Sequence, residues 1–230
     1  MDTDTLIPKI KENGSIKLLH QIQNDFIGLD TKYQIVDGEE KRRIYLDSTA
    51  STLMMGIAHR TGEKFLEHYA NTHSLMHFSA KIATKTYAWV HERILEFVHA
   101  DLEHYTCFFT GSGTTAGMNR IARIFNHLQP SKDVVLVSIM EHHSNDLLHR
   151  KHGGHVIHIP VDTHESKMGC VDLDLLEHYL MEYEGRVNYV SVTGISNVTG
   201  IINPINEVAK LAHHYDAYIV VDAAQMAAHV

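Results

Sequence analysis

Cysteine is nearly absent from this sequence. Only Cys107 and Cys170 occur among its 230 residues. Two isolated thiols provide neither a disulfide framework nor a paired metal-binding motif. Cys107 lies inside the apolar run YTCFFT, where a thiol usually packs as a small hydrophobic group rather than reacting. Functions that depend on disulfides or on cysteine-bound metal are therefore disfavoured.

Long hydrophobic runs and an excess of positive charge are also lacking. No apolar run approaches the ~20 residues that span a bilayer. The amino-terminal stretch MDTDTLIPKIKENGS lacks the basic start and apolar centre of a secretion signal. The formal net charge of -8 disfavours a nucleic-acid partner, because an acidic chain repels the phosphate backbone. We therefore expect a cytoplasmic protein that binds neither membranes nor nucleic acids.

Hydrophobic residues are nonetheless plentiful, at 44% of the sequence, as in an ordinary soluble globular protein. From residue 105 onward, short β-branched or aromatic runs alternate with amphipathic stretches. This alternation predicts an α/β fold of three layers, with a mainly parallel sheet and helices on both faces. The predicted strands are YTCFF (105–109), DVVLVS (133–138), HVIHIPV (155–161), VNYVSVT (187–193) and AYIVVD (217–222).

The part before residue 105 is mostly helical in its pattern. A long amphipathic helix there is preceded by a helix around residues 15–27 and a short strand at residues 42–47. We expect residues 1–30 to form an N-terminal arm and residues 31–230 to form one large domain. The apolar stripe of the long helix contains Ile82, Trp89, Val90, Ile94, Phe97 and Val98.

A glycine turn joins a predicted strand to a predicted helix at FTGSGTTAGMNRI (109–121). Glycines let the backbone approach an anion, the N–H groups of the helix start point toward it, and the Thr114 and Thr115 hydroxyls add donors. The turn therefore suits a phosphate. No lysine follows the last glycine as in a Walker loop, and the spacing GxGxxxG departs from the dinucleotide fingerprint. A capped helix after a tight turn is the alternative.

Histidines are concentrated in MEHHSNDLLHRKHGGHVIH (140–158). Four of them recur at every third residue from His149 to His158, but a Gly-Gly pair interrupts any helix, and the last two fall on opposite faces of a strand. A metal site is therefore disfavoured. The motif EHHSN follows the strand at residues 133–138, so an imidazole there could stack on a flat ring. A solvated surface histidine is the alternative.

Two further polar motifs follow predicted strands, at the sheet edge where ligands of parallel sheets bind. SNVTGIINPI (196–205) places Asn197 at this edge, where capping of the loop is the alternative function. VDAAQ places Asp222 after four apolar residues, where an unpaired charge is costly, so we expect a cationic partner. Helix capping by Asp222 is the alternative, although it leaves Gln225 unexplained.

Taken together and in this order, the motifs resemble the class V aminotransferases, the pyridoxal 5'-phosphate enzymes that include the cysteine desulfurases. The resemblance covers residues 44–230. It implies the large domain of a pyridoxal-phosphate-dependent transferase, a small amino-acid substrate and a homodimer. The matching segments are YLDSTAS (45–51), NTHS (71–74), the glycine turn, EHHSN, SNVTG and VDAAQ.

The resemblance also implies roles for individual residues. Gly113, Thr114 and Thr115 would bind the phosphate, and His142 would stack on the cofactor ring. Asp222 would face the pyridine nitrogen, and a buried carboxylate there keeps the nitrogen protonated, so that the ring accepts electrons from the substrate α-carbon. The remaining implied contacts are Asn197 and Gln225 near the phenolic oxygen, and Ala50 and His73 near the substrate or a neighbouring subunit.

One family feature is missing from the sequence. In the family, a lysine in a Ser-x-His-Lys-like segment, roughly twenty residues beyond the Asp-x-x-Gln turn, holds the cofactor as a Schiff base. The last lysine here is Lys210, in the predicted helix before the final strand, where solvent exposure is expected. We therefore expect the amino-terminal part of such an enzyme, truncated before that lysine, which alone binds the cofactor weakly and turns over nothing.

Two other functions stay open. The chain could be a non-catalytic remnant, or a subunit of a split enzyme, that binds a partner polypeptide. A nucleotide-dependent enzyme that uses the glycine turn would instead bind a dinucleotide. The motifs do not distinguish desulfuration from transamination, epimerisation or elimination.

Overall fold

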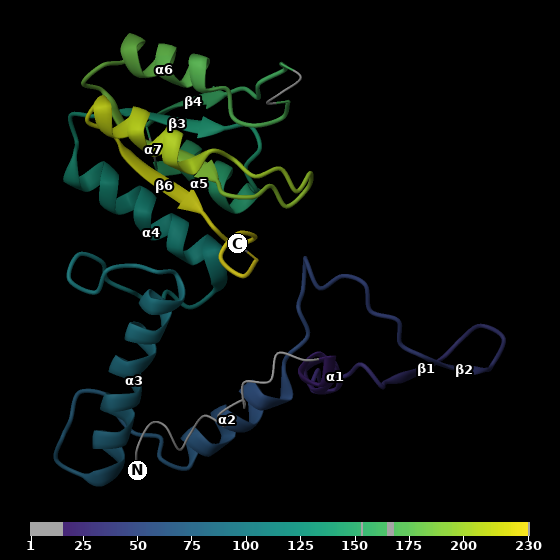
Figure 1. Ribbon diagram of the computed structural model, residues 1–230. Helices are drawn as coiled ribbons and strands as arrows, with labels where there is room; N and C mark the ends of the chain where they lie inside the picture. The colour runs from purple at the N-terminus through teal and green to yellow at the C-terminus, as the bar shows by residue number, and fades with distance from the viewer. Residues whose placement is uncertain (1–15, 153, 165–167, 230) are drawn as a thin grey trace. The chain divides into compact units, whose positions relative to one another are not determined.

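The computed structural model describes residues 16–152, 154–164 and 168–229. The chain divides into two compact units, Met1–Phe108 and Phe109–Val230. Most of their helices and strands are labelled in Figure 1. None of the described helices is long and apolar enough to cross a membrane.

The first unit combines helices with a small antiparallel hairpin. Asp25 fixes the start of one helix, because its carboxylate accepts a hydrogen bond from the Ile57 N–H (2.6 Å) and pairs with Arg60 (2.8 Å). The strand predicted at residues 42–47 is wrong, because pairing in the hairpin ends where Lys32 meets Arg42. The elements are α1 (Ile16–Asn24), β1 (Lys32–Gln34), β2 (Glu40–Arg42), α2 (Gly56–Leu66) and α3 (Phe78–Phe97).

The second unit is built on a parallel sheet. Its four strands lie in the order β4-β3-β5-β6, and every neighbouring pair is parallel. A helix connects each strand to the next in the sequence, as parallel neighbours require. The elements are α4 (Gly113–Leu128), β3 (Val134–Ser138), α5 (His143–His152), β4 (His155–Ile159), α6 (Leu173–Glu182), β5 (Val187–Thr193), α7 (Ile205–His214) and β6 (Tyr218–Asp222).

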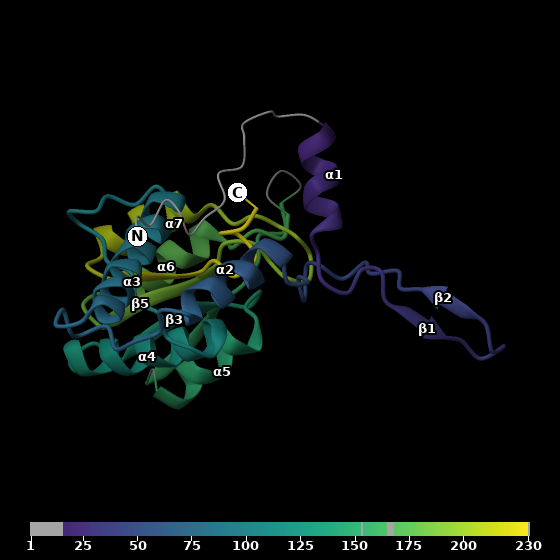
Figure 2. The same ribbon diagram turned by 90° about the horizontal axis from the view of Figure 1, so that it is seen from below.

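Successive strand residues in this unit pack against opposite pairs of helices. Leu136 and Val190 belong to an apolar cluster with residues of α6 and α7, whereas Val137 and Tyr189 pack with residues of α4 and α5. Figure 2 shows these two helix pairs on opposite sides of the strands. Because both faces are covered, the strands read as continuous apolar runs. The predicted three-layer α/β fold with a parallel sheet is confirmed.

Four predicted strands are confirmed, but the fifth, at residues 105–109, is wrong. A strand needs a hydrogen-bonded neighbour, and no described strand lies beside this run. Tyr105 and Phe108 are accordingly 63% and 75% exposed.

Gly154, between α5 and β4, has a conformation that other residues rarely adopt. Its φ is +80°, and an added Cβ would lie 2.5 Å from the carbonyl oxygen of Asp133. That oxygen also accepts a hydrogen bond from His155 (2.8 Å), at the start of β4. We expect Gly154→Ala to lower the free energy of unfolding by about 2–3 kcal/mol. The cost of the strained backbone and the cost of displacing the start of β4 add to each other. Urea denaturation measures the loss.

Gly185→Ala is the matched control for this substitution. Gly185 has a φ of +74°, but apart from its chain neighbours no described atom lies within 4 Å of the position that its Cβ would take. Its replacement should lower the free energy of unfolding by about 1 kcal/mol, through backbone strain alone. Equal losses in the two variants would show that the contact with Asp133 is unimportant.

Candidate active site

Polar residues lie at and beyond the carboxyl ends of three neighbouring strands. Because the strands are parallel, these ends share one edge, where Thr193, the last residue of β5, is in register with Asp222, the last residue of β6. His142, Asn197 and Gln225 follow the ends of β3, β5 and β6 after short turns. This edge is where ligands of parallel α/β sheets bind.

Helix α4 runs with its amino-terminal end toward the same edge. The Asn188 side chain, at the start of β5, donates a hydrogen bond to the Phe125 carbonyl (3.0 Å) near the end of α4. The end of the helix therefore lies at the opposite edge of the sheet. With 16 residues, α4 spans about 24 Å, which is long enough to carry its first turn to the carboxyl edge.

The first turn of α4 offers hydrogen-bond donors to an anion. Ser112, which precedes the helix, makes no side-chain cap within the described part of the chain. Gly113 has a φ of +64°, and apart from its chain neighbours and the backbone of its own helix, no described atom lies within 4 Å of the position that its Cβ would take. Thr114 is half-buried and Thr115 is exposed. Backbone N–H groups, an open approach and two hydroxyls together fit a phosphate.

His142 is held in place as the residue that precedes α5. Its carbonyl accepts hydrogen bonds from Asn145 (2.8 Å) and Asp146 (3.1 Å). Its Nδ1 accepts a hydrogen bond from the Ser144 N–H (3.1 Å) and lies 2.8 Å from the Ser144 hydroxyl oxygen. This contact fixes the ring of an otherwise exposed side chain, and it assigns the acceptor role to Nδ1.

Asp222 brings a buried carboxylate to the same edge. The residue is 3% exposed, and its Oδ1 accepts a hydrogen bond from the Ala224 N–H (3.0 Å). Gln225 is half-buried in the turn that follows. This turn packs on the end of β5, because a Cβ on Gly194 would lie 2.5 Å from the sulfur of Met226. A buried carboxylate can hold a cationic partner strongly because little water competes.

Asn197 lies in an exposed turn after β5. The Ser196 hydroxyl accepts hydrogen bonds from Val198 (3.3 Å) and Thr199 (3.2 Å). Asn203 anchors the far side of the turn, since its side-chain amide donates to the Thr193 carbonyl (2.9 Å). The turn therefore holds Asn197 beside the end of β5.

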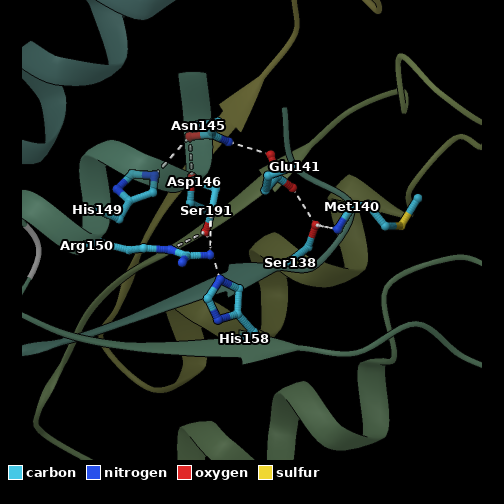
Figure 3. Close-up of polar contacts among 9 residues, drawn as sticks. All are labelled: Ser138, Met140, Glu141, Asn145, Asp146, His149, Arg150, His158 and Ser191. Atoms are coloured by element: carbon cyan, nitrogen blue, oxygen red, sulfur yellow. Dashed lines mark hydrogen bonds and ion pairs between the residues drawn. The ribbon is translucent and has the colours of Figure 1, made fainter. Parts of the chain in front are cut away.

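A buried polar network connects β3, α5 and β5 next to these residues (Figure 3). Glu141 accepts hydrogen bonds from the Ser138 hydroxyl, from the Asn145 amide (2.5 Å) and from the Thr193 N–H (2.6 Å). The Oδ1 of Asn145 accepts from the Ser191 hydroxyl (2.9 Å) and lies 2.9 Å from the His149 Nε2. The network therefore ties together three elements that are far apart in the sequence.

The network continues to Tyr189, whose hydroxyl lies 2.8 Å from the Nδ1 of His149. Burial lowers the pKa of the His149 imidazole to about 4, although the nearby charge of Asp146 acts to raise it. A neutral ring can donate from Nε2 to Asn145 and accept at Nδ1 from Tyr189. Each hydrogen bond from Tyr189 through His149 to Asn145 then has one donor and one acceptor.

Glu141 is the most perturbed acid of the network. Burial, and to a smaller extent the charge of Asp222, raise the pKa of its carboxyl to about 7, although the hydrogen bonds from Ser138, Asn145 and Thr193 act in the opposite direction. Glu141 is therefore close enough to Asp222 for their charges to interact. A cavity of about 370 Å³, walled also by side chains of α5 and β4, adjoins Glu141, so its proton can exchange with water.

Sequence patterns missed this network, although one signal was present. Asn145, Leu148 and His149 are the buried residues of α5, and their spacing is that of a helix face. Two of the three are polar, so the apolar periodicity that predicts helices is absent. A histidine and an asparagine one turn apart on a buried face require each other as hydrogen-bond partners.

Two other predicted contact residues belong to a different unit of the chain. Ala50 and His73 belong to the first unit, and both are exposed. Within the described ranges, no group of histidine, cysteine or acidic residues could hold a metal ion. Lys210 is exposed on α7, as expected.

Residues 44–230 match the model of the family described as Aminotransferase class-V. The chain belongs to this family. Class-V aminotransferases and the cysteine desulfurases among them are pyridoxal-phosphate-dependent enzymes. The resemblance stated from the motifs is thereby confirmed over the same residues, and the cofactor is that of the family.

Curated relatives of this class-V chain include cysteine desulfurases. It is 29% identical over 217 residues to a probable cysteine desulfurase of Halalkalibacterium halodurans, in a match that covers 92% of this chain and 50% of the relative. A cysteine desulfurase of Cronobacter sakazakii is 31% identical with the same coverage. The chain therefore spans about half the length of these curated relatives.

Solved structures agree with the class-V assignment. The apo structure of a cysteine desulfurase from Thermococcus onnurineus matches with a TM-score of 0.67 and 30% identity, over 81% of this chain and 45% of that one. A cysteine desulfurase structure from Escherichia coli, at 24% identity, shares the fold with a TM-score of 0.65.

Proposed function

We propose that this chain supplies the phosphate-binding and ring-binding residues of a cysteine desulfurase-like enzyme that acts on an amino acid. The observation that carries the proposal is the buried carboxylate of Asp222 at the carboxyl edge of the sheet, at 3% exposure, on the same edge as the open amino-terminal turn of α4. The comparisons give no support to a non-catalytic remnant, since the relatives are named as enzymes.

The first turn of α4 would bind the cofactor phosphate. The Gly113 N–H already donates to the Gly111 carbonyl (2.6 Å). The backbone N–H groups that follow it in the first turn carry the positive end of the helix dipole, which favours an anion. The hydroxyls of Thr114 and Thr115 would add two donors. A side chain at position 113 would occupy the open approach to this turn, so the glycine keeps the backbone accessible.

Asp222, His142, Asn197 and Gln225 would hold the ring. The Asp222 carboxylate would accept a hydrogen bond from the pyridine nitrogen and keep the proton on that atom, since burial strengthens a charge-assisted bond. The His142 imidazole would lie against the ring face, and the two amides would donate to its phenolic oxygen. When bound, pyridoxal phosphate supplies a ring that accepts electrons from the substrate α-carbon.

Further contacts of the whole enzyme also belong to this proposal. Ala50 and His73 would contact the substrate or a second subunit of a homodimer, and the protein would work in the cytoplasm. No lysine follows Lys210 in the sequence. We expect the 230-residue chain alone to bind pyridoxal phosphate without a covalent bond and to show no turnover.

Cofactor binding tests the proposal directly. Titration of the purified chain with pyridoxal phosphate should give a saturable change in visible absorbance and circular dichroism. Asp222→Asn should weaken binding by about tenfold or more, because a hydrogen bond to a charged group contributes about 1.5–3 kcal/mol. The bound cofactor should be removable after borohydride treatment.

Asp216→Asn is the matched control. Asp216 is an acid just before the opposite end of the same strand, where it pairs with Lys132 (2.8 Å). Its replacement should change the affinity by less than about twofold. No binding by the wild-type chain, or equal losses in the two variants, would refute the proposed site. A borohydride-stable adduct together with turnover would refute the expectation of a non-covalent, inactive chain.

A further inference from the structure

Glu141 stands at the junction of the elements that carry the proposed ring-binding residues. It follows β3 and directly precedes His142 in the sequence. Its two carboxylate oxygens divide their contacts, because Oε2 accepts from the Asn145 amide (2.5 Å) on α5 and Oε1 accepts from the Thr193 N–H (2.6 Å) on β5. A single side chain therefore links the turn of His142 to the end of β5.

The contact at Thr193 extends this link to the other side of the site. Thr193 is in register with Asp222, and its hydroxyl donates to the Ile195 carbonyl (2.9 Å) in the turn that leads to Asn197. A shift of the Glu141 carboxyl away from Thr193 would therefore move the His142 turn relative to both Asp222 and Asn197.

The bonds of the network require an acceptor at position 141. Asn145 already uses its Oδ1 for Ser191 and His149, so its amide nitrogen must donate to residue 141. The Thr193 N–H is also a donor. A glutamine at position 141 would point its own N–H₂ at one of these two donors, and a buried donor without an acceptor is costly.

We propose that Glu141 is a positioning residue of the proposed cofactor site, whose carboxyl group sets the place of the His142 imidazole relative to Asp222 and Asn197. The proposal rests on the proposed function. It differs from a general structural role, because it requires that loss of the carboxyl alter how the ring is held and not only how stably the chain folds.

Reversing the direction of one hydrogen bond distinguishes the positioning role of Glu141 from a general structural role. Glu141→Gln leaves the Asn145 amide facing another donor. The double variant Glu141→Gln/Asn145→Asp restores this bond in reverse, since the new amide at position 141 would donate to the new carboxylate at position 145, whose other oxygen still accepts from Ser191 and His149. Tyr189→Phe is the control, because it removes the contact with His149 (2.8 Å) at the far end of the same network.

The experiment compares the wild-type chain and these three variants by pyridoxal phosphate affinity, by the circular dichroism of the bound cofactor at saturation, and by urea denaturation. We expect E141Q to bind about tenfold more weakly with altered dichroism, and the double variant to recover affinity to within about threefold. Y189F should lower the urea midpoint but leave affinity and dichroism unchanged. Unchanged affinity and dichroism in E141Q, or equal changes in Y189F, would overturn the proposal.

A cofactor-free measurement keeps this proposal distinct from the proposed function. In ¹⁵N spectra of the chain without cofactor, E141Q should shift the amide signals of His142 and Asn197. In the double variant these signals should return toward their wild-type positions. Absence of these shifts overturns the role of Glu141 even if the wild type binds cofactor. Absence of binding by the wild type overturns the proposed function, whatever the spectra show.

Discussion

Asn145→Ala is expected to remove a large share of the folding stability of this chain. Asn145 is fully buried, and its side chain bonds to Glu141, Ser191 and His149. Alanine would leave three buried polar groups without this partner, at about 1–2 kcal/mol each. A loss of about 3–6 kcal/mol is a large share of a typical stability of about 5–15 kcal/mol. The urea denaturation midpoint measures it.

Asn126→Ala provides the comparison for this result. Asn126 is an exposed asparagine on α4 whose amide donates to the His152 carbonyl (2.9 Å). Its replacement should lower the free energy of unfolding by less than about 1 kcal/mol, because water takes over an exposed bond. If Asn145→Ala lost no more than this control, the network would contribute little to folding.

The second large effect is in the pH dependence of stability. The pKa of Glu141 is raised from 4.5 to about 7 in the folded chain. Its contribution to the free energy of unfolding is therefore fully present below pH 4.5 and is lost as the pH rises through 7. The pKa of His149 is lowered from 6.5 to about 4. Its contribution to the free energy of unfolding is therefore fully present above pH 6.5 and is lost as the pH falls through 4. Between pH 4.5 and 6.5, Glu141 makes the free energy of unfolding fall with increasing pH, whereas His149 makes it rise, so the two effects oppose each other.

Removing one partner should expose the slope of the other. In Glu141→Gln, the free energy of unfolding should rise relative to wild type as the pH increases from 4.5 to 6.5, by up to about 1.4 kcal/mol per pH unit. In His149→Gln it should fall relative to wild type over the same window. Urea denaturation at several pH values measures both differences. Parallel pH profiles in all three proteins would show that neither group is perturbed by burial.

The second unit was largely predictable because the strands of a buried parallel sheet have a recognisable sequence pattern. Val134 to Ser138 and Val187 to Thr193 are buried at every position, so both strands appear as uninterrupted runs of mostly apolar residues. The run at residues 105–109 has the same character, but composition does not reveal whether a neighbouring strand is present. Helix α5 was missed because polar side chains occupy much of its buried face.

The candidate site was predictable only in part for a related reason. A polar residue just after an apolar run marks the sheet edge, which is how Asp222 and Asn197 were found. One partner of Glu141, by contrast, is the backbone of Thr193, 52 positions away in the sequence. Such a contact depends on which strands are neighbours in the sheet, and a single sequence does not specify that order.

The fully buried strand β5 has a consequence for how tightly a ligand could be held. Its end contacts Glu141, pairs with Asp222 and leads into the turn of Asn197. These groups are therefore preorganised by the core before any ligand arrives. Association then requires little ordering of side chains, and more of the contact energy remains available as affinity.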